Sequence, residues 1–372
     1  MSALQRLRAP STVLGLICLL SLCCLAIENL HFVDSLLGTT YHRTQTIWMV
    51  LGLIGAGVVA SVDIRFMRRL ALPTYQILVV LLAAVLVWGR EINFSRRWIE
   101  LGPANIQPSE FMKLGVVLVL ADWFDKRQAK EPWPLRQLIM PGALMLVPVI
   151  LINREPDLGT SLCVLFIAAG VILYEGVRTR TLIVTVFLAL VASGVAWQTG
   201  LVRDYQKGRV ESWYQSLDDE TPVHSKPSSD RSQAELALWA IGSGRLSGRS
   251  DDEARASVLR HLPFVHTDFA LAPFAERFGL LGCAGLFSLY LGVVLWALRV
   301  AARATDRFDA LVAVGIGGLV FWQFFINAGM VIGLLPVVGL TLPLFSYGGS
   351  SALTVLMGAG FLVNIAARRK GR

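Results

Sequence analysis

Four short polar stretches interrupt a largely apolar sequence, and each holds residue types that could handle protons or bind anions. One stretch, 261–279, contains Asp268, which directly follows His266 and Thr267 and precedes an apolar run. An aspartate at such a place either caps the helix that begins there or accepts a proton in a reaction. Its neighbours in space decide between these two interpretations.

A second stretch, 96–113, leads into another apolar run. Pro108 is typical of a first helical turn, which places Glu110 and Lys113 three residues apart on one face of that helix. An ionisable pair at that depth in a membrane is energetically expensive and indicates a functional site. The alternative is an interfacial ion pair that only fixes how the helices pack.

The third and fourth stretches also open apolar runs. Asp157 and Thr160 lie in the third, 155–161, and the fourth, 345–351, is a glycine turn flanked by serines. Taken alone, an acidic N-cap explains the third stretch, and a glycine turn followed by a serine cap explains the fourth. Neither one specifies chemistry by itself.

The apolar runs that these stretches punctuate indicate membrane helices. The 372-residue sequence is 55% hydrophobic and 16% charged, with a mean hydropathy of +0.60, which is unlike a soluble domain. Runs of about 17 to 22 apolar residues recur, the length that crosses a hydrocarbon core of about 30 Å. Lipid offers the backbone no hydrogen-bond partners, so these runs must be helical. The sequence therefore predicts an all-α polytopic membrane protein, with 1–372 as a single integral-membrane domain.

The ten expected spans are 11–27, 46–63, 71–88, 109–124, 137–152, 158–175, 180–198, 278–299, 308–331 and 350–367. The first is expected to remain as an uncleaved helix, because no small-residue cleavage site follows it. One long extracytoplasmic loop, 199–277, is left between the seventh and eighth spans. Within it, 218–230 is expected to be flexible and 233–242 to form a short helix on the membrane surface.

Basic residues set the expected orientation. With the N-terminus in the cytoplasm, the inner loops collect Arg65, Arg68, Arg69, Lys126, Arg127, Lys130, Arg136, Arg178, Arg180, Arg299, Arg303, Arg307, Arg368, Arg369, Lys370 and Arg372. The short outer loops hold only Arg43, Arg90, Arg96, Arg97 and Arg154. This asymmetry follows the positive-inside rule and places both termini in the cytoplasm. The net charge of +8 therefore reflects topology, and no nucleic-acid partner is expected from such scattered charges.

The orientation brings the four polar stretches to one surface. The fourth, sixth, eighth and tenth spans would all begin at the outer face, each with its polar stretch at that end. Helix N-termini present free N–H groups and a partial positive charge, which favour anions. Arg96, Arg97 and Lys113 add formal positive charge, and Asp157 and Asp268 supply carboxylates. The sequence thus predicts an outer-leaflet site for an anionic, phosphate-bearing amphiphile, with a base at hand. The cysteines Cys18, Cys23, Cys24, Cys163 and Cys283 all lie inside spans and are expected to be small hydrophobic residues.

These motifs, in this order on ten helices, resemble the SEDS family (shape, elongation, division and sporulation). The resemblance covers most of the chain. It is carried by Trp98 with Gln107-Pro-Ser-Glu-Phe111, by Pro156-Asp-Leu-Gly-Thr160, by His266-Thr-Asp-Phe269, and by Gly333-Leu-Leu-Pro336 with Ser346-Tyr-Gly-Gly-Ser-Ser351. The string 327–336 is more similar to the rod-shape branch, RodA, whereas 339–343 has the character of the division branch, FtsW.

The resemblance implies a peptidoglycan glycosyltransferase that polymerises lipid II at the outer face of the bacterial cytoplasmic membrane, for cell elongation and shape. Asp268 corresponds to the essential aspartate of the family. The implied substrate-binding residues are Arg97, Trp98, Gln107, Ser109, Glu110, Lys113, Asp157, Thr160, His266, Thr267, Ser346, Tyr347, Gly348, Gly349 and Ser350. Two positions depart from the family pattern: Phe264 stands where a glutamate is usual, and Arg245 where a glycine is usual.

The expected chemistry is an inverting glycosyl transfer. A lipid pyrophosphate is already a good leaving group, so no strong acid is needed, whereas the attacking sugar hydroxyl must lose a proton. Asp268 is expected to take that proton, and cationic groups with helix N-termini to stabilise the departing pyrophosphate. A divalent cation, Mg²⁺ or Mn²⁺, is compatible with this reaction, although no ligand spacing in the sequence specifies one.

Two other functions are open at this point. A lipid II flippase would use the same polar residues as a headgroup path, but it should carry charge through the whole bilayer depth, whereas here the charges cluster at the outer ends. A non-catalytic scaffold would not explain a carboxylate beside an anion site. Besides lipid II and membrane lipids, the resemblance implies a class B penicillin-binding protein (a transpeptidase) and other elongation-complex proteins as partners. The small residues Gly282, Gly285, Gly315, Gly317 and Gly318 in the eighth and ninth spans mark the expected partner groove, or else internal packing.

Overall fold

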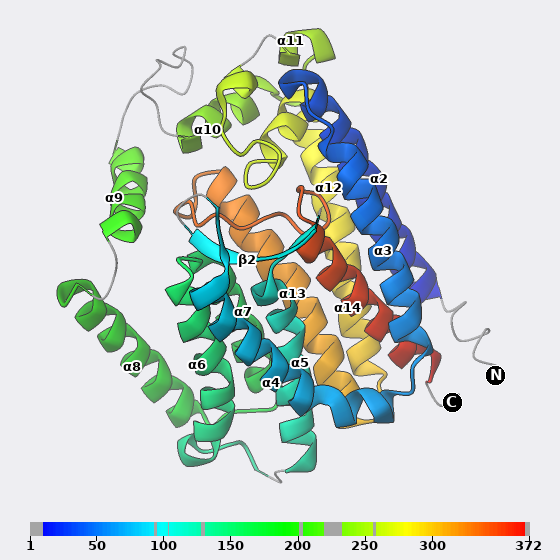
Figure 1. Cartoon of the computed structure of the whole chain (residues 1–372), viewed down its shortest axis with the longest axis vertical. Helices are drawn as coiled ribbons and strands as arrows, with labels where there is room; N and C mark the ends of the chain where they lie inside the picture. Colours follow the sequence, from blue (N-terminus) through cyan, green and yellow to red (C-terminus); the bar gives the residue numbers. More distant parts are fainter. Residues whose placement is uncertain are drawn as a thin grey trace.

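The computed structural model describes residues 10–92, 95–102, 104–127, 131–200, 204–218, 233–255 and 258–368. Most of them form helices that run up and down between two ends of the molecule (Figure 1). The long helices are α2 (Pro10–Leu37), α3 (Tyr41–Ser61), α4 (Ile64–Trp88), α5 (Pro108–Lys126), α6 (Ile139–Arg154), α7 (Leu158–Tyr174), α8 (Thr179–Gln198), α12 (Leu271–Ala302), α13 (Arg307–Val331) and α14 (Gly349–Ala367). Each coincides with one of the expected spans, which confirms a helical membrane protein.

Length and hydropathy qualify eight of the described helices to cross a membrane. Those eight leave out α7, which is apolar but 17 residues long, and α5. Helix α5 carries charged residues near both of its ends, and all but a few of its side chains are buried. It can tolerate those charges because neighbouring helices, rather than lipid, surround it.

Smaller elements lie in the upper half of Figure 1. They are the antiparallel sheet of β1 (Arg90–Ile92), β2 (Ser95–Leu101) and β3 (Ala104–Ile106), and the short helices α9 (Asp204–Asp218), α10 (Gln233–Ser243) and α11 (Asp251–Arg255). The sheet lies near mid-height, and α10 and α11 lie at the top. Two 3₁₀ turns, η1 (Leu135–Leu138) and η2 (Val258–His261), complete the list of elements. Helix α10 confirms that 233–242 is helical, and its expected place on the membrane surface stays a prediction. The expected flexible segment 218–230 falls, apart from Asp218, outside the described residues.

The helix ends differ from the expected ones in an informative way. Helix α12 begins at Leu271 rather than at 278, because the chain is already helical before Gly279, where φ is 62° and ψ is −164°. The loop at 245–249 packs into this break. Its carbonyls at Arg245 and Leu246 accept from the N–H groups of Leu280 and Leu281 at 2.9 and 3.1 Å. The interruption therefore costs the helix few hydrogen bonds.

Two glycines let the loop approach this closely. A Cβ added to Gly248 would lie 2.0 Å from the Arg277 carbonyl oxygen, and one added to Gly279 would lie 2.4 Å from the Gly248 nitrogen. Both glycines also have positive φ. A side chain at either position would push the loop out of the break.

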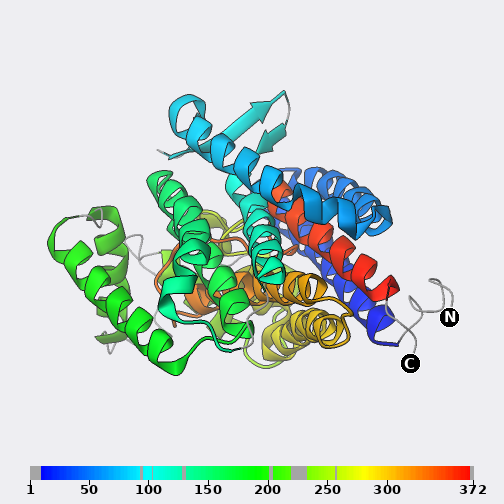
Figure 2. The ribbon, with the colours of Figure 1, turned by 90° about the horizontal axis from the view of Figure 1, so that it is seen from below.

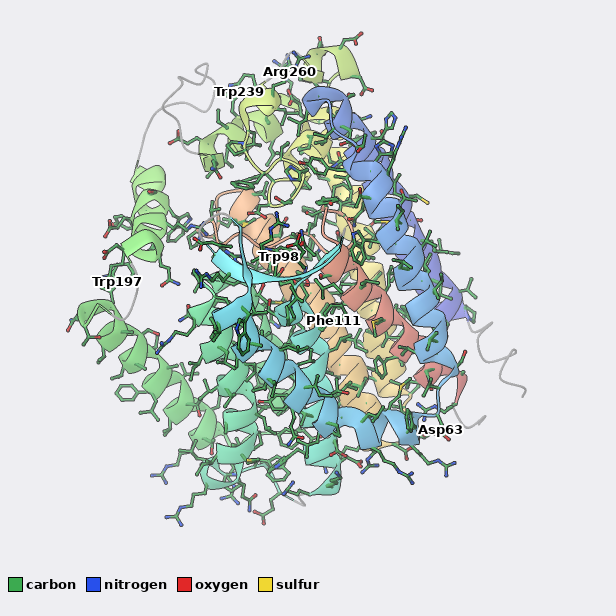
Figure 3. All side chains as sticks on the ribbon, in the orientation of Figure 1. Asp63, Trp98, Phe111, Trp197, Trp239 and Arg260 are labelled. Carbon is green, nitrogen blue, oxygen red and sulfur yellow. The ribbon has the colours of Figure 1, made fainter. Side chains whose placement is uncertain are left out.

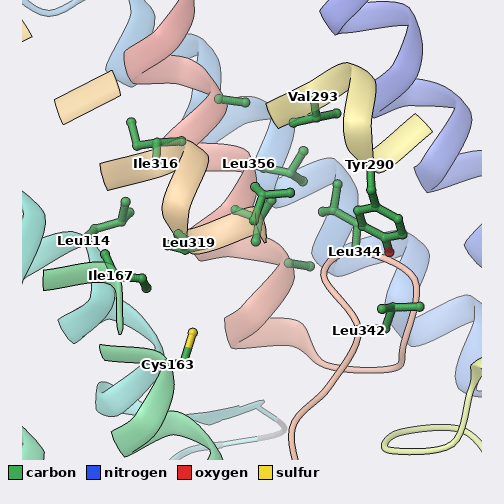
Figure 4. Close-up of a cluster of buried hydrophobic side chains, with 14 of the residues drawn as sticks. Leu114, Cys163, Ile167, Tyr290, Val293, Ile316, Leu319, Leu342, Leu344 and Leu356 are labelled. Carbon is green, nitrogen blue, oxygen red and sulfur yellow. The ribbon is translucent and has the colours of Figure 1, made fainter. Parts of the chain in front are cut away.

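Hydrophobic side chains fill the centre of the bundle. Figure 4 shows part of this core, to which Leu114, Ile167, Tyr290, Ile316 and Leu356 contribute from five different helices. At the edge of the molecule, by contrast, α8 has Thr181 as its one buried residue, and both views place this helix on the outside (Figures 1 and 2). Apolar side chains cover α8, as expected of a helix that faces lipid.

Basic residues gather at the lower end, where Asp63 is labelled in Figure 3. The loops and helix ends there carry Arg65, Arg68, Arg69, Lys126, Arg127, Arg136, Arg178, Arg180, Arg299, Arg303, Arg307 and Arg368. Trp239 and Arg260 are at the opposite, upper end (Figure 3). The expected inner residues that the structure describes therefore share one end of the molecule, whereas Lys130, Arg369, Lys370 and Arg372 lie outside the described residues.

Candidate active site

The four polar stretches meet about halfway up the molecule as drawn in Figure 1, below the short helices α10 and α11. Helices α5, α7 and α14 begin there, and residues 266–268 lie in the loop just before α12 (Figure 1). The chain order alternates up and down through the bundle, so every second helix starts on the same side. This geometry is the one that the sequence predicted.

Asp157 lies at the centre of the first group of contacts. Its carboxylate accepts from the Thr160 backbone N–H at 3.0 Å as the N-cap of α7, and from Gln107 Nε2 at 2.9 Å. The Gln107 backbone N–H in turn donates to Ser350 Oγ at 3.0 Å. Asp157 is thus a helix cap and also the residue that ties α7 to the starts of α5 and α14.

Arg97 approaches this group from the sheet. Its Nη1 lies 3.5 Å from Asp157 Oδ2, its Nη2 donates to the Pro156 carbonyl at 3.3 Å, and its Nε donates to Ser95 Oγ. About a quarter of the side chain stays exposed, so the guanidinium can also reach a ligand. Trp98 lies next to it on β2, where it pairs with Arg90 (Figure 3). Among the described residues, no hydrogen bond or ring contact joins the Trp98 side chain to the rest of the group.

Glu110 and Lys113 form a second, deeper group. Lys113 Nζ donates to Glu110 Oε1 at 2.8 Å and to Gln323 Oε1 at 3.1 Å, and the lysine is fully buried. Gln323 then donates to Ser351 Oγ at 2.8 Å. This chain of polar groups joins α5, α13 and α14. Ser109 and Glu110 Oε2 are buried nearby without partners in the described part of the chain.

Asp268 is not a helix cap. The N-cap of α12 is Ala270, and no side chain caps that helix. The Asp268 carbonyl accepts from Asn327 Nδ2 at 2.9 Å, which holds the backbone of the loop against α13. A Cβ added to Gly339 would lie 3.4 Å from Asp268 Oδ2 and 3.9 Å from Arg209 Nη1. The Asp268 carboxylate and the Arg209 guanidinium therefore both lie beside Gly339, which has no side chain to separate them.

Electrostatics suit Asp268 to proton transfer. Burial raises its pKa to about 6, and the guanidinium groups of Arg97 and Arg209 oppose that rise while Asp157 adds to it. A carboxyl with such a pKa is ionised at neutral pH, yet it is more basic than an ordinary aspartate. The same burial depresses the pKa of His266, two residues earlier.

The glycine turn closes the site from the side of α14. The Tyr347 backbone N–H donates to the His266 carbonyl at 2.8 Å, and Ser346 Oγ accepts from the Leu342 N–H at 2.9 Å. Gly348 is the N-cap of α14 and has no side-chain capping bond. The serine-cap interpretation of this turn is therefore wrong, because Ser350 bonds to Gln107 instead. A Cβ added to Gly349 would lie 2.4 Å from Trp48.

Three residues that contact the site were not predicted from the sequence: Gln45, Gln323 and Arg209. Gln45 bridges the glycine turn, as its Oε1 accepts from the Gly348 N–H at 3.0 Å, and Gln323 links Lys113 to α14. Both are amides in apolar surroundings, and that signal could have found them. Arg209 lies on α9, which was expected to be loop, so nothing in the sequence placed it beside Asp268.

Glu155 is a further buried carboxyl of the site. It is fully buried, and neither of its side-chain oxygens has a hydrogen-bond partner among the described residues. Burial raises its pKa to about 9, Asp157 adds to the rise and Arg97 opposes it. This group is therefore protonated and neutral at physiological pH, unlike Asp268.

Both departures from the family pattern fall at loop positions with a left-handed backbone. Arg245 has a φ of 50° and Phe264 a φ of 56°, in the left-handed region where non-glycine residues are uncommon. Phe264 closes the turn that carries the site, because its carbonyl accepts from the Thr267 and Phe269 N–H groups at 3.0 and 3.2 Å. Within the described residues, no group of three or more His, Cys, Asp or Glu side chains is placed to hold a metal ion.

Comparisons with known proteins agree with this arrangement. The family model FTSW_RODA_SPOVE, described as "Cell cycle protein", matches residues 3–371. The chain is 35% identical over 322 residues to peptidoglycan glycosyltransferase MrdB of Escherichia coli K12, covering 87% of this chain and 84% of that one. It is 33% identical over 344 residues to the probable peptidoglycan glycosyltransferase FtsW of Hydrogenovibrio crunogenus, covering 92% and 85%.

Solved structures give the same result. The rod shape determining protein RodA of Thermus thermophilus is similar, with a TM-score of 0.69 and 30% identity over 96% of this chain and 97% of that chain. A chain from a structure titled "Structural coordination of polymerization and crosslinking by a peptidoglycan synthase complex" reaches a TM-score of 0.79 with 31% identity, over 95% and 96%. The protein therefore belongs to the FtsW/RodA/SpoVE family of cell cycle proteins, the SEDS family.

Proposed function

We propose that this protein is a peptidoglycan glycosyltransferase that polymerises lipid II into glycan strands. Relatives that bear this name match 92% and 87% of the chain. Within the site, the observation that carries the proposal is Asp268. Its carboxylate is partly buried, raised in pKa to about 6, and placed near the guanidinium groups of Arg97 and Arg209. A base beside two cations is the arrangement that sugar transfer from a pyrophosphate requires.

The reaction follows from these groups. The acceptor hydroxyl of one sugar attacks the anomeric carbon of the donor sugar, and its proton passes to an Asp268 carboxylate oxygen. The bond from the anomeric carbon to the phosphate oxygen breaks, and the lipid pyrophosphate leaves with the electron pair. Arg97 and Arg209 stabilise its growing negative charge. Attack from the opposite face inverts the anomeric carbon, so an α-linked donor gives a β-linked product.

The remaining proposed site residues position the substrate. Asp157, Gln107, Thr160 and Ser350 hold the starts of three helices together, so that their free N–H groups face the same space. Lys113 and Glu110 lie a turn deeper and support this surface through Gln323. Trp98, Ser109, His266, Thr267, Ser346, Tyr347, Gly348 and Gly349 remain proposed substrate-binding residues on the strength of their motifs.

The proposed topology has ten membrane spans. Helix α5 has 19 residues and α7 has 17, so at 1.5 Å per residue they are about 29 and 26 Å long and can cross a core of about 30 Å inside the bundle. The basic lower end would face the cytoplasm, which puts both termini there and the site on the outer face. Residues 199–277 would then form an extracytoplasmic insertion in a single membrane domain.

The biological role follows the branch of the family. The rod-shape motif at 327–336 supports a role in cell elongation and shape, with the division-specific role as the alternative, and the relatives include members of both branches. One of the similar structures is a peptidoglycan synthase complex. We therefore include a class B penicillin-binding protein, which would crosslink the strands, and other elongation-complex proteins as partners.

The decisive test compares wild type with Asp268→Asn in polymerisation of purified lipid II. The amide keeps the shape of the side chain but cannot accept a proton, so polymer should fall by about two to four orders of magnitude with little change in thermal melting. Asp63→Asn is the matched control, because Asp63 is exposed at the lower end and asparagine caps a helix well.

An active Asp268→Asn variant would remove Asp268 from the mechanism. A wild-type protein that makes no polymer, but moves lipid II across vesicle membranes, would support a flippase instead. The same assay after treatment with EDTA, and with Mg²⁺ or Mn²⁺ added back, measures whether a divalent cation on the pyrophosphate assists the reaction.

A further inference from the structure

The loop that carries Asp268 packs against Tyr41, the first residue of α3. The Tyr41 ring stacks on the His266 ring with centroids 4.2 Å apart and planes 4° apart. Tyr41 also lies 4.8 Å from Tyr347, centroid to centroid, and the Tyr347 backbone N–H donates to the His266 carbonyl. His266 is therefore held between α3 and the glycine turn, two residues before Asp268.

The stack is the main restraint on the His266 ring. Within the described part of the chain, the buried His266 Nδ1 has no hydrogen-bond partner, and the other ring nitrogen makes no hydrogen bond either. Further along the loop, Asn327 holds the Asp268 carbonyl, and the Asp268 carboxylate bonds to the Thr267 side chain of the same loop. The His266 and Asp268 carbonyls are both held by hydrogen bonds. The position of the His266 ring therefore helps to fix the backbone conformation of residues 266–268.

Tyr41 is itself rigidly placed. Asp34, near the end of α2, is buried and accepts from the backbone N–H groups of Tyr41 and His42 at 2.9 and 2.8 Å. The same carboxylate accepts from Thr39 Oγ1 and bonds to His42 Nδ1. A carboxylate with several N–H and O–H donors makes strong, charge-assisted bonds. The α2–α3 turn is therefore rigid. Because the Tyr41 ring stacks on His266, this rigid turn fixes where the His266 ring lies.

We propose that Tyr41 is a positioning residue for the transfer reaction, which keeps the Asp268 carboxylate in reach of the acceptor hydroxyl through its stack on His266. This inference rests on the proposed function. Misplacing a reacting group by about 1 Å can cost on the order of 100-fold in rate. Loss of the flat ring should therefore slow turnover much more than it weakens substrate binding.

The kinetic test uses three variants in the lipid II assay. Tyr41→Leu removes the flat ring and should lower kcat at least about tenfold, with KM within about twofold of wild type. Tyr41→Phe keeps the ring and should stay within about twofold in both constants. Tyr75→Leu is the matched control, because Tyr75 is a buried tyrosine on α4 that hydrogen bonds to the Leu144 carbonyl, away from the site. Melting temperatures of all variants show whether they fold.

A second measurement needs no substrate. Thr267→Cys, in a chain in which the exposed Cys24 is replaced by alanine, places a thiol on the loop. Its rate of reaction with a methanethiosulfonate reagent should rise at least about threefold when Tyr41→Leu is added, and should not change with Tyr41→Phe or Tyr75→Leu.

The outcomes are distinguishable. Unchanged kcat and unchanged thiol reactivity in Tyr41→Leu overturn the inference, as does an equal loss of kcat in Tyr75→Leu. If wild type makes no polymer, the proposed function fails, and the thiol reaction still decides whether Tyr41 holds the loop.

Discussion

Asp268 should give the reaction a recognisable pH dependence. Its pKa is raised to about 6, and a general base works only in its deprotonated form. We expect kcat/KM to be constant above about pH 7 and to fall about tenfold per pH unit below pH 6. The pH profile of lipid II polymerisation measures this. A profile that stays flat down to pH 4.5 would exclude Asp268 as the titrating base.

Glu155 should instead make stability depend on pH. Its pKa rises from 4.5 to about 9 on folding, so the folded protein binds more protons than the unfolded chain between these values. Stability should then fall as pH rises through that window. Glu155→Gln removes this penalty, so at pH 8 it should raise the free energy of unfolding by up to about 5 kcal/mol. The melting temperature should rise accordingly at pH 8 and hardly change at pH 4.5. An equal effect at both values would contradict the assignment.

Individual residues show where sequence reasoning succeeds and where it ends. Asp157 and Asp268 could be found because acidic residues beside apolar runs are rare and costly. Their partners could not, because the contact of Arg209 with the Asp268 region depends on how α9 folds back over the bundle. Tyr41 was missed for a similar reason, since an aromatic residue at a helix start has many ordinary uses.

At the scale of helices, breaking the buried Glu110–Lys113 ion pair on α5 should strongly destabilise the bundle. Lys113 is fully buried against Glu110 and Gln323. Removing one partner leaves an uncompensated charge, which should destabilise the bundle by about 3–5 kcal/mol in Glu110→Gln or Lys113→Met. The double variant should recover much of that loss, as thermal melting would show.

A control pair lies on the same helix. Lys126 is mostly exposed and pairs with Asp122 at 2.6 Å, so Lys126→Met should cost about 1 kcal/mol or less. If the single and double α5 variants all fold normally and lose activity equally, Lys113 and Glu110 contact the substrate rather than support the helices.

Helix positions were predictable to a greater extent than helix ends. Apolar runs marked every long helix, because the bilayer demands length and hydrophobicity. The strands β1–β3 and helix α9 were missed, since they lie outside any apolar run. The early start of α12 was missed because the break at Gly279 is closed by a loop from 245–249, a long-range contact that no local pattern shows.

For the whole molecule, the open question is where a membrane partner binds. The glycines of the expected partner groove on α12 and α13 differ in their surroundings. A Cβ on Gly315 would lie 2.5 Å from Val117, and one on Gly317 would lie 3.1 Å from Ala297, so these two glycines serve internal packing. A Cβ on Gly285 would meet nothing within 4 Å, which leaves this glycine available to a partner helix.

The partner helix should therefore pack where Gly285 is exposed on α12. Small residues let helix backbones approach closely in lipid, so Gly285→Leu should weaken co-purification of a class B penicillin-binding protein at least about tenfold. The bundle should melt normally, because the new side chain enters open space. Gly142→Leu on α6 is the matched control, since a Cβ there also meets nothing within 4 Å. Equal recovery of the partner from both variants would move the interface away from α12, and failure to recover any such enzyme with wild type would remove the partner from the proposal.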